Sequence, residues 1–154
     1  MNIFYYADSS ALVKRHIPEI GSAWIEKEFD SASRNTVITA KLTVIEVLSA
    51  LNRRQRESSI SAAEYAKFSS DFLDLAQDDY RIFELTDAVL LESQRLLETH
   101  PLRAGDAIQL ASALLANAQL QSANLPALIF LASDARLLTA ATNEGLLTDD
   151  PQNH

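Results

Sequence analysis

Short apolar segments alternate with longer amphipathic ones along almost the whole chain, and this alternation limits the possible folds more than any other feature. Strands are expected at 2–7, 36–40, 81–85, 127–133 and 146–148. Segments of this kind, separated by helices, are typical of a parallel sheet with helices on both faces. We therefore expect an α/β fold, a three-layer α/β/α sandwich around a short central parallel sheet of four to five strands.

The helical pattern is clear in the intervals between these strands. Helices are expected at 9–16, 21–32, 42–57, 61–77, 86–100, 105–120 and 134–145. Ser61 and Glu64 have the spacing of a capping box, and Gly145 is placed to end the last helix. The segment 105–120 is strongly apolar, and its expected buried face consists of Ala107, Ile108, Ala111, Leu114, Leu115 and Ala118.

Length and composition indicate one soluble domain. The chain has 154 residues, enough for a single core, which we expect over 1–148 with a short C-terminal tail at 149–154. It has no cysteine, no pattern of a signal peptide, and no apolar run longer than 125–132, so we expect a cytoplasmic protein without membrane association. Its net charge of −8 argues against a general polyanion binder.

Four acids occupy special positions in this pattern. Asp8 follows the first expected strand and Asp134 follows the strand at 127–133, whereas Glu46 and Asp106 lie near the starts of helices. Each aspartate alone is most simply explained as a helix cap or first-turn acid, and Glu46 as a solvated polar residue. In a parallel sheet with right-handed crossovers, however, all four positions fall on the same edge of the sheet, where ligands bind.

Grouped carboxylates repel one another and raise each other's pKa unless a cation compensates. The three histidines, at 16, 100 and 154, do not have the spacing of a zinc site, and there is no cysteine. Oxygen ligands without nitrogen or sulfur favour a hard divalent cation, so Mg²⁺ or Mn²⁺ is the expected cofactor. No serine or cysteine is placed to act as a covalent nucleophile.

Four segments carry a family resemblance: "YYADSSALVKRHIPEIGS", "LTVIEVLSALNRRQRE", "LRAGDAIQLASAL" and "FLASDARLLTAATNEGL". Together they resemble a PIN domain (PilT N-terminus), and are most similar to the VapC-type toxins of bacterial toxin–antitoxin pairs. The likeness runs in order from about residue 3 to 148, and "DSSALVK" and "GDAIQLA" are its most specific parts. It implies a single PIN-like domain.

The resemblance implies a metal-dependent endoribonuclease that hydrolyses RNA phosphodiester bonds. Its acidic quartet corresponds to Asp8, Glu46, Asp106 and Asp134, with Asp8 and Asp106 as principal ligands and the other two holding a second ion or orienting water. Ser10 matches a small hydroxyl residue that supports the metal or a phosphate. Many members carry a further aspartate or threonine beside the fourth acid, whereas here the segment supplies only Ser133.

The resemblance also implies partners: a small antitoxin encoded alongside, and a second copy of the chain in a homodimer. Basic residues near the acids are candidate RNA contacts, namely Lys14, Arg53 and Arg103. The alternative is a PIN-like protein-binding module with weak or no nuclease activity, which predicts at least one missing acid. A phosphorylated receiver or dehalogenase-like protein fits less well, since Asp8 has no upstream acids and position 10 is a serine.

Overall fold

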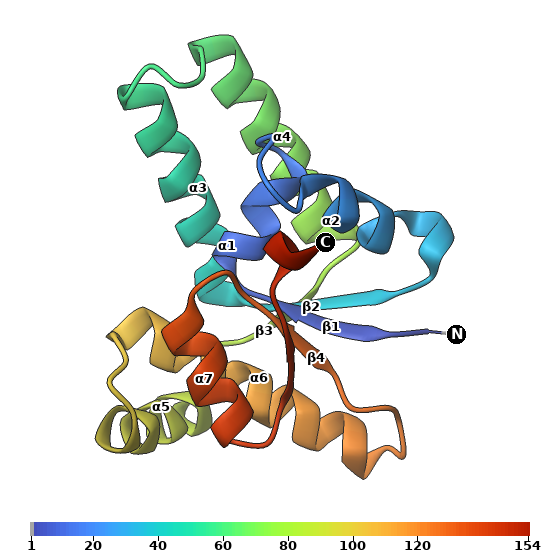
Figure 1. Cartoon of the computed structure of the whole chain (residues 1–154), viewed down its shortest axis with the longest axis vertical. Coiled ribbons are helices and arrows are strands. Elements are labelled where there is room, and N and C mark those ends of the chain that lie inside the picture. The colour runs from blue at the N-terminus through green and yellow to red at the C-terminus, as the bar shows by residue number, and fades with distance from the viewer. Residues whose placement is uncertain (1) are drawn as a thin grey trace.

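The chain forms three layers, with one parallel sheet between two groups of helices (Figure 1). A computed structural model describes residues 2–154. The sheet has the strand order β3-β2-β1-β4-β5 and every neighbouring pair is parallel. The strands are β1 (Phe4–Ala7), β2 (Thr36–Ala40), β3 (Arg81–Phe83), β4 (Ile129–Leu131) and β5 (Leu147–Asp149). The expected three-layer fold with a parallel sheet of four to five strands is confirmed.

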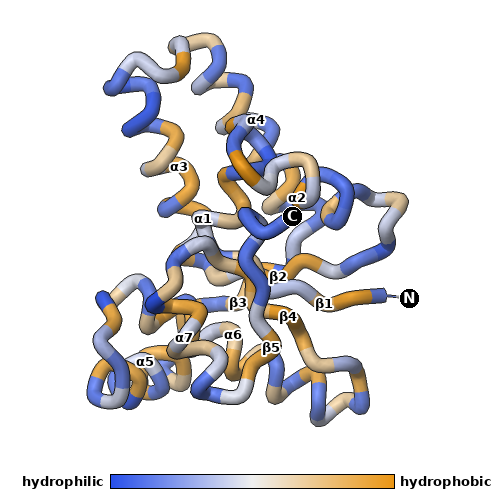
Figure 2. The backbone as a smooth tube through the Cα atoms, viewed as in Figure 1, coloured by the Kyte–Doolittle hydropathy of each residue, from blue (hydrophilic) through white to orange (hydrophobic). Residues whose placement is uncertain are grey.

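Strand β1 lies at the centre of the sheet and is buried on both faces. Its side chains alternate, as those of any strand must. Phe4 and Tyr6 belong to the core beneath one face, and Tyr5 and Ala7 to the core beneath the other. This is why the first segment of the sequence is apolar without interruption, and Figure 2 shows the hydrophobic colour at the start of β1 and along β4.

Two groups of helices cover the two faces of the sheet (Figure 1). On one face lie α1 (Ser9–Leu12), α2 (Ser22–Phe29), α3 (Lys41–Arg56) and α4 (Ala62–Asp78). On the other lie α5 (Asp87–Thr99), α6 (Ala104–Ser122) and α7 (Ala135–Asn143). Three short 3₁₀ segments complete the chain: η1 (Val13–Arg15), η2 (Ser31–Ser33) and η3 (Pro151–Asn153).

The local signals at helix ends are confirmed. Ser61 and Glu64 form the reciprocal capping box at the start of α4, with N–H to oxygen distances of 3.0 and 2.9 Å. Gly145 follows α7 with φ at 92°, the left-handed conformation that a glycine adopts without steric strain. Within residues 2–154, no helix is both long and apolar enough to cross a membrane.

The expected buried face of helix 105–120 is only partly correct. Ala107 and Ala111 are fully buried, but Leu114 and Leu115 are half-buried and Ala118 is exposed. The helix packs between the sheet and α5, so a second side of it is also covered. This side includes a glutamine, Gln109, that is only 2% exposed. An amphipathic pattern has one apolar face and could not predict a polar residue inside the core.

Two segments differ from expectation in their local structure. The helix expected at 9–16 is α-helical only to Leu12 and then tightens into η1, and the strand expected at 127–133 spans only β4. The C-terminal segment expected as a tail is folded onto α2. Pro151 is buried, and the His154 ring stacks on Trp24 with centroids 4.2 Å apart. Gly21, with φ at 92°, allows this approach: a Cβ atom there would lie 2.5 Å from the Pro151 carbonyl oxygen.

Candidate active site

The four acids lie at the carboxyl edge of the sheet, around the point where the strand order reverses. The chain leaves β1 toward β2 on one side, and β4 pairs with β1 on the other. Asp8 directly follows β1 and Asp134 follows β4, so they flank this point. Ligands bind at such switch points in parallel sheets because the loops from neighbouring strands separate there and leave an opening.

Asp8 is both a helix cap and a buried acid. Its Oδ1 accepts hydrogen bonds from the Ala11 backbone N–H at 3.1 Å and from the Ser10 hydroxyl at 2.6 Å. The side chain is only 6% exposed. Burial, and to a smaller extent the carboxylates of Glu46 and Asp106, raise the pKa of Asp8 to about 7 against the opposing effect of these two hydrogen bonds.

Two of the other acids, Glu46 and Asp106, lie within helices. Glu46 lies in the second turn of α3 and is half-buried, and Asp106 lies in the first turn of α6. Burial raises the pKa of both carboxyls, and a neighbouring acid adds to the effect: Asp106 for Glu46, and Asp134 for Asp106. The Coulomb repulsion therefore links all four acids into one group, with Asp8 at one end.

Asp134 caps α7 in the way expected of an isolated aspartate. Its Oδ1 accepts a hydrogen bond from the Arg136 backbone N–H at 2.9 Å, and its side chain is exposed. Asp134 is thus both the N-cap of α7 and a member of the group of four acids. One carboxylate oxygen satisfies the helix end, which leaves the other free to face the cavity.

A cavity of about 650 Å³ opens among these residues. Glu46, Asp106 and Asp134 line it together with two arginines, Arg103 and Arg136. Arg103 is one of the candidate RNA contacts predicted near the acids from the sequence, but Arg136 is not among them. A polar cavity that joins carboxylates to guanidinium groups can bind a phosphate diester through the arginines, with any cation held by the acids.

The donor set fits a hard divalent cation. Within residues 2–154, no three acidic, histidine or cysteine side chains are already arranged to hold a metal ion. The hydrogen bonds to Asp8, Glu46 and Asp134, however, each reach only one carboxylate oxygen, and the second oxygen remains available as a ligand. Oxygen donors whose repulsion raises their pKa are suited to Mg²⁺ or Mn²⁺.

A chain of hydroxyl groups connects Asp8 to the C-terminal segment. The Ser10 Oγ that donates to Asp8 also accepts from the Ser133 backbone N–H at 3.0 Å. The Ser133 hydroxyl in turn donates to Asp150 Oδ1 at 3.2 Å. Ser133 stands alone beside Asp134 in sequence, and the structure brings a further acid, Asp150, to it from the residue that follows β5. No sequence pattern predicts this contact, because Asp150 lies in the segment expected as a tail.

The other two candidate RNA contacts lie away from the cavity lining. Lys14 is only 4% exposed, and its Nζ makes an ion pair with Glu19 at 3.0 Å. In this position Lys14 faces the protein interior and does not present its charge to a ligand. Arg53 is exposed in the last turn of α3, two turns beyond Glu46, and does not line the cavity.

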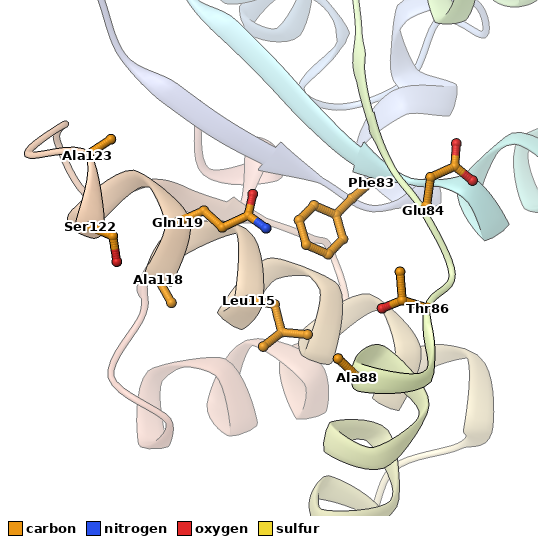
Figure 3. A pocket seen from close by; sticks show the side chains of 9 residues that line it. All are labelled: Phe83, Glu84, Thr86, Ala88, Leu115, Ala118, Gln119, Ser122 and Ala123. Atoms are coloured by element: carbon orange, nitrogen blue, oxygen red, sulfur yellow. The ribbon is translucent and has the colours of Figure 1, made fainter.

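A second, more apolar hollow of about 670 Å³ lies beside the edge strand β3. Figure 3 shows the Phe83 ring directed toward Leu115 and Gln119 of α6, with Thr86 and Ala88 from the start of α5 nearby. None of the four acids lines this hollow. It is therefore separate from the candidate active site.

Comparison with known proteins identifies the family to which this chain belongs. The chain matches the PIN domain family over residues 5–141 and belongs to that family. It is 31% identical over 140 residues to two ribonucleases of Mycobacterium tuberculosis, VapC45 of strain CDC 1551 / Oshkosh and VapC49 of strain H37Rv. Each alignment covers 91% of this chain and 90% of the relative. The chain is thus a PIN-domain protein related to VapC ribonucleases.

Solved structures share the fold at lower sequence identity. PAE2754 from Pyrobaculum aerophilum superposes with a TM-score of 0.63 at 20% identity, over 99% of this chain and 94% of that chain. A toxin–antitoxin complex from Klebsiella pneumoniae gives 0.61 at 14%, over 96% and 97%. Mycobacterium tuberculosis VapC20, a sarcin-ricin loop cleaving toxin, gives 0.62 at 15%, over 93% and 96%.

Proposed function

We propose that this PIN-domain protein is a metal-dependent endoribonuclease, the toxin of a VapBC-type toxin–antitoxin pair. The observation that carries the proposal is the group of four carboxylates at the switch point of the sheet. Three of them line one cavity with two arginines, and Asp8 is coupled to Glu46 and Asp106. The similarity to two proteins named as ribonucleases supports the same activity.

The acids would hold the cofactor, Mg²⁺ or Mn²⁺. Asp8 and Asp106 are the proposed principal ligands, and Glu46 and Asp134 hold a second ion or orient a water molecule. When bound, a divalent cation neutralises phosphate oxygens and lowers the pKa of a water molecule that attacks phosphorus. Ser10 keeps Asp8 in place by occupying Oδ1, so that Oδ2 stays directed away from the helix end.

The arginines would supply the contacts to RNA. Arg103 and Arg136 line the cavity and can each donate two parallel hydrogen bonds to one phosphate. They give the cavity a local positive border, which lets a chain with a net charge of −8 approach a polyanion. Arg53 can extend the contact along α3, whereas Lys14 is occupied by Glu19.

The proposed partners are a small antitoxin and a second copy of the chain, and the setting of the activity is the cytoplasm. Large apolar side chains are exposed on α5, where Leu90 is 48% and Leu91 72% exposed, and on α3, where Ile45 is 61% exposed. Surfaces of this kind are typical of interfaces with another protein. Light scattering of the purified chain, alone and after co-expression with the neighbouring open reading frame, tests both partners.

Cleavage of RNA by the purified chain tests the activity. We expect cleavage with Mg²⁺ or Mn²⁺, none with EDTA, and losses of at least about a hundred-fold in Asp8→Asn and Asp106→Asn. Asp74→Asn is the matched control, because Asp74 is exposed on α4 and far in sequence from the quartet. If RNA stays intact with every metal while the chain still binds a protein partner, the binding-module alternative is correct instead.

A further inference from the structure

Gln109 is a polar side chain enclosed in the core directly behind the candidate site. It lies on α6 one turn after Gly105, is 2% exposed, and contacts residues from two other elements. Its Oε1 accepts a hydrogen bond from the Tyr6 hydroxyl at 2.6 Å, and the Thr43 hydroxyl lies 3.1 Å from the same oxygen. Its Nε2 donates to Glu46 Oε1.

The hydrogen bonds fix which end of the amide faces Glu46. The Glu46 carboxylate can only accept a hydrogen bond, so the amide atom that faces it is the donor Nε2, and Oε1 is then the atom that accepts from the Tyr6 hydroxyl. Tyr6 is completely buried and cannot turn away, and Thr43 is also fully buried. The amide therefore has one orientation, which presents an N–H donor to the carboxylate.

This donor determines what Glu46 can offer to the cavity. Its Oε1 is engaged by Gln109, so Oε2 is the oxygen left for a ligand. A Cβ atom at Gly105 would lie 3.3 Å from Oε2, so that oxygen lies against the first turn of α6, next to Asp106. The absence of a side chain at Gly105 leaves the space in which Oε2 is held.

We propose that Gln109 is a positioning residue: held by Tyr6 and Thr43, it fixes the Glu46 carboxylate so that only Oε2 faces a divalent cation or its water in the cavity. This inference rests on the proposed metal-dependent function and adds a residue outside the acidic quartet. It explains why a glutamine is buried on α6, since an apolar residue at this position would leave Glu46, Tyr6 and Thr43 without this partner.

The test is Mn²⁺ binding by calorimetry to the full-length chain, at a temperature far below its unfolding midpoint. We expect Gln109→Leu to weaken Mn²⁺ binding by roughly ten- to hundred-fold, the effect typical of losing a hydrogen-bond partner behind a metal ligand. The double variant Tyr6→Phe/Thr43→Val retains Gln109 but removes both groups that orient it, and should weaken binding in the same direction. Catalytic turnover at saturating Mn²⁺ should fall as well.

Tyr80→Phe is the matched control for the loss of a buried phenol hydroxyl. Tyr80 is 7% exposed, and its hydroxyl has no hydrogen-bond partner within residues 2–154. This control should bind Mn²⁺ as the unmodified chain does. A purely structural Gln109 would lower the unfolding midpoint and leave the Mn²⁺ affinity of the folded protein unchanged, and that result overturns the inference.

The outcomes separate this inference from the proposed function. If the unmodified chain binds no Mn²⁺, both are wrong. If it binds Mn²⁺ and loses binding in Asp8→Asn but not in Gln109→Leu, the metal site stands and only the positioning role is wrong. If Gln109→Leu does not fold, the double variant decides alone, and unchanged affinity there overturns the inference.

Discussion

Replacing Asp8 by asparagine should stabilise the metal-free protein while it abolishes activity. Asparagine keeps the oxygen that accepts from Ser10 and Ala11, and it removes a charge that is buried beside other carboxylates. Raising the pKa of Asp8 from 3.8 to about 7 corresponds to at most about 4 kcal/mol of folding free energy. For a chain of this size, that is an increase of up to about 16 °C in the unfolding midpoint.

The sign of this effect depends on pH. The unfolded chain ionises Asp8 near pH 3.8 and the folded chain only near pH 7, so the folded state binds the proton more tightly. The metal-free protein therefore loses stability as pH rises from about 4 to about 7, and the loss is complete above pH 7. The advantage of Asp8→Asn should be large at pH 8 and small at pH 4.5.

Urea unfolding followed by circular dichroism, in EDTA at both pH values, measures this advantage. The control is Asp74→Asn on exposed α4, which should stay within about 0.5 kcal/mol of the unmodified chain at each pH. Adding Mn²⁺ should stabilise the unmodified chain and not the Asp8→Asn variant. The reasoning is refuted if Asp8→Asn is no more stable at pH 8, or if its advantage is the same at both pH values.

Two further substitutions test the contacts around the site. Ser10→Ala removes the hydroxyl that joins Asp8 to the Ser133 N–H, and urea unfolding should show a loss of about 1–3 kcal/mol; a loss below about 0.5 kcal/mol would contradict the structure. Gly21→Ala places an alanine in the left-handed conformation and also pushes its Cβ atom against Pro151 in the C-terminal segment. Gly145→Ala is the control, because it has the same φ but its Cβ atom would meet no other atom within 4 Å. Gly21→Ala should therefore unfold at clearly lower urea, and equal losses would show that the contact contributes nothing.

The fold and the acids could be predicted from the sequence because both depend on local patterns. The segment 36–40 is β2 residue for residue, and the capping box of α4 has the expected partners. Strand ends and helix starts place carboxylates on one edge of a parallel sheet wherever the crossovers are right-handed. Asp8 and Glu46 are 38 residues apart, yet topology alone predicts that they come close.

The remaining parts of the site depend on contacts between residues distant in sequence. Gln109 is buried because its partner Tyr6 is 103 residues away, and no periodicity along α6 contains that information. Lys14 is a candidate RNA contact in the sequence because it is basic and follows Asp8 by six residues, but in the structure its Nζ makes an ion pair with Glu19 inside the protein. Asp150 was missed because a segment with few apolar residues gives no signal of packing.

Because β1 is the central strand, the first strand to be synthesised pairs along one edge with β4, one of the last strands to be synthesised. Its neighbour on one side, β2, follows within 40 residues, but its other neighbour, β4, begins at Ile129. On the ribosome, the nascent chain therefore carries one unpaired edge of β1 until most of the protein has been made. The Asp8 backbone N–H donates a hydrogen bond to the Leu131 carbonyl oxygen, so the group of four acids cannot assemble before Leu131 emerges from the ribosome. A prematurely terminated chain would expose an unpaired strand edge prone to aggregation and would lack an assembled candidate active site.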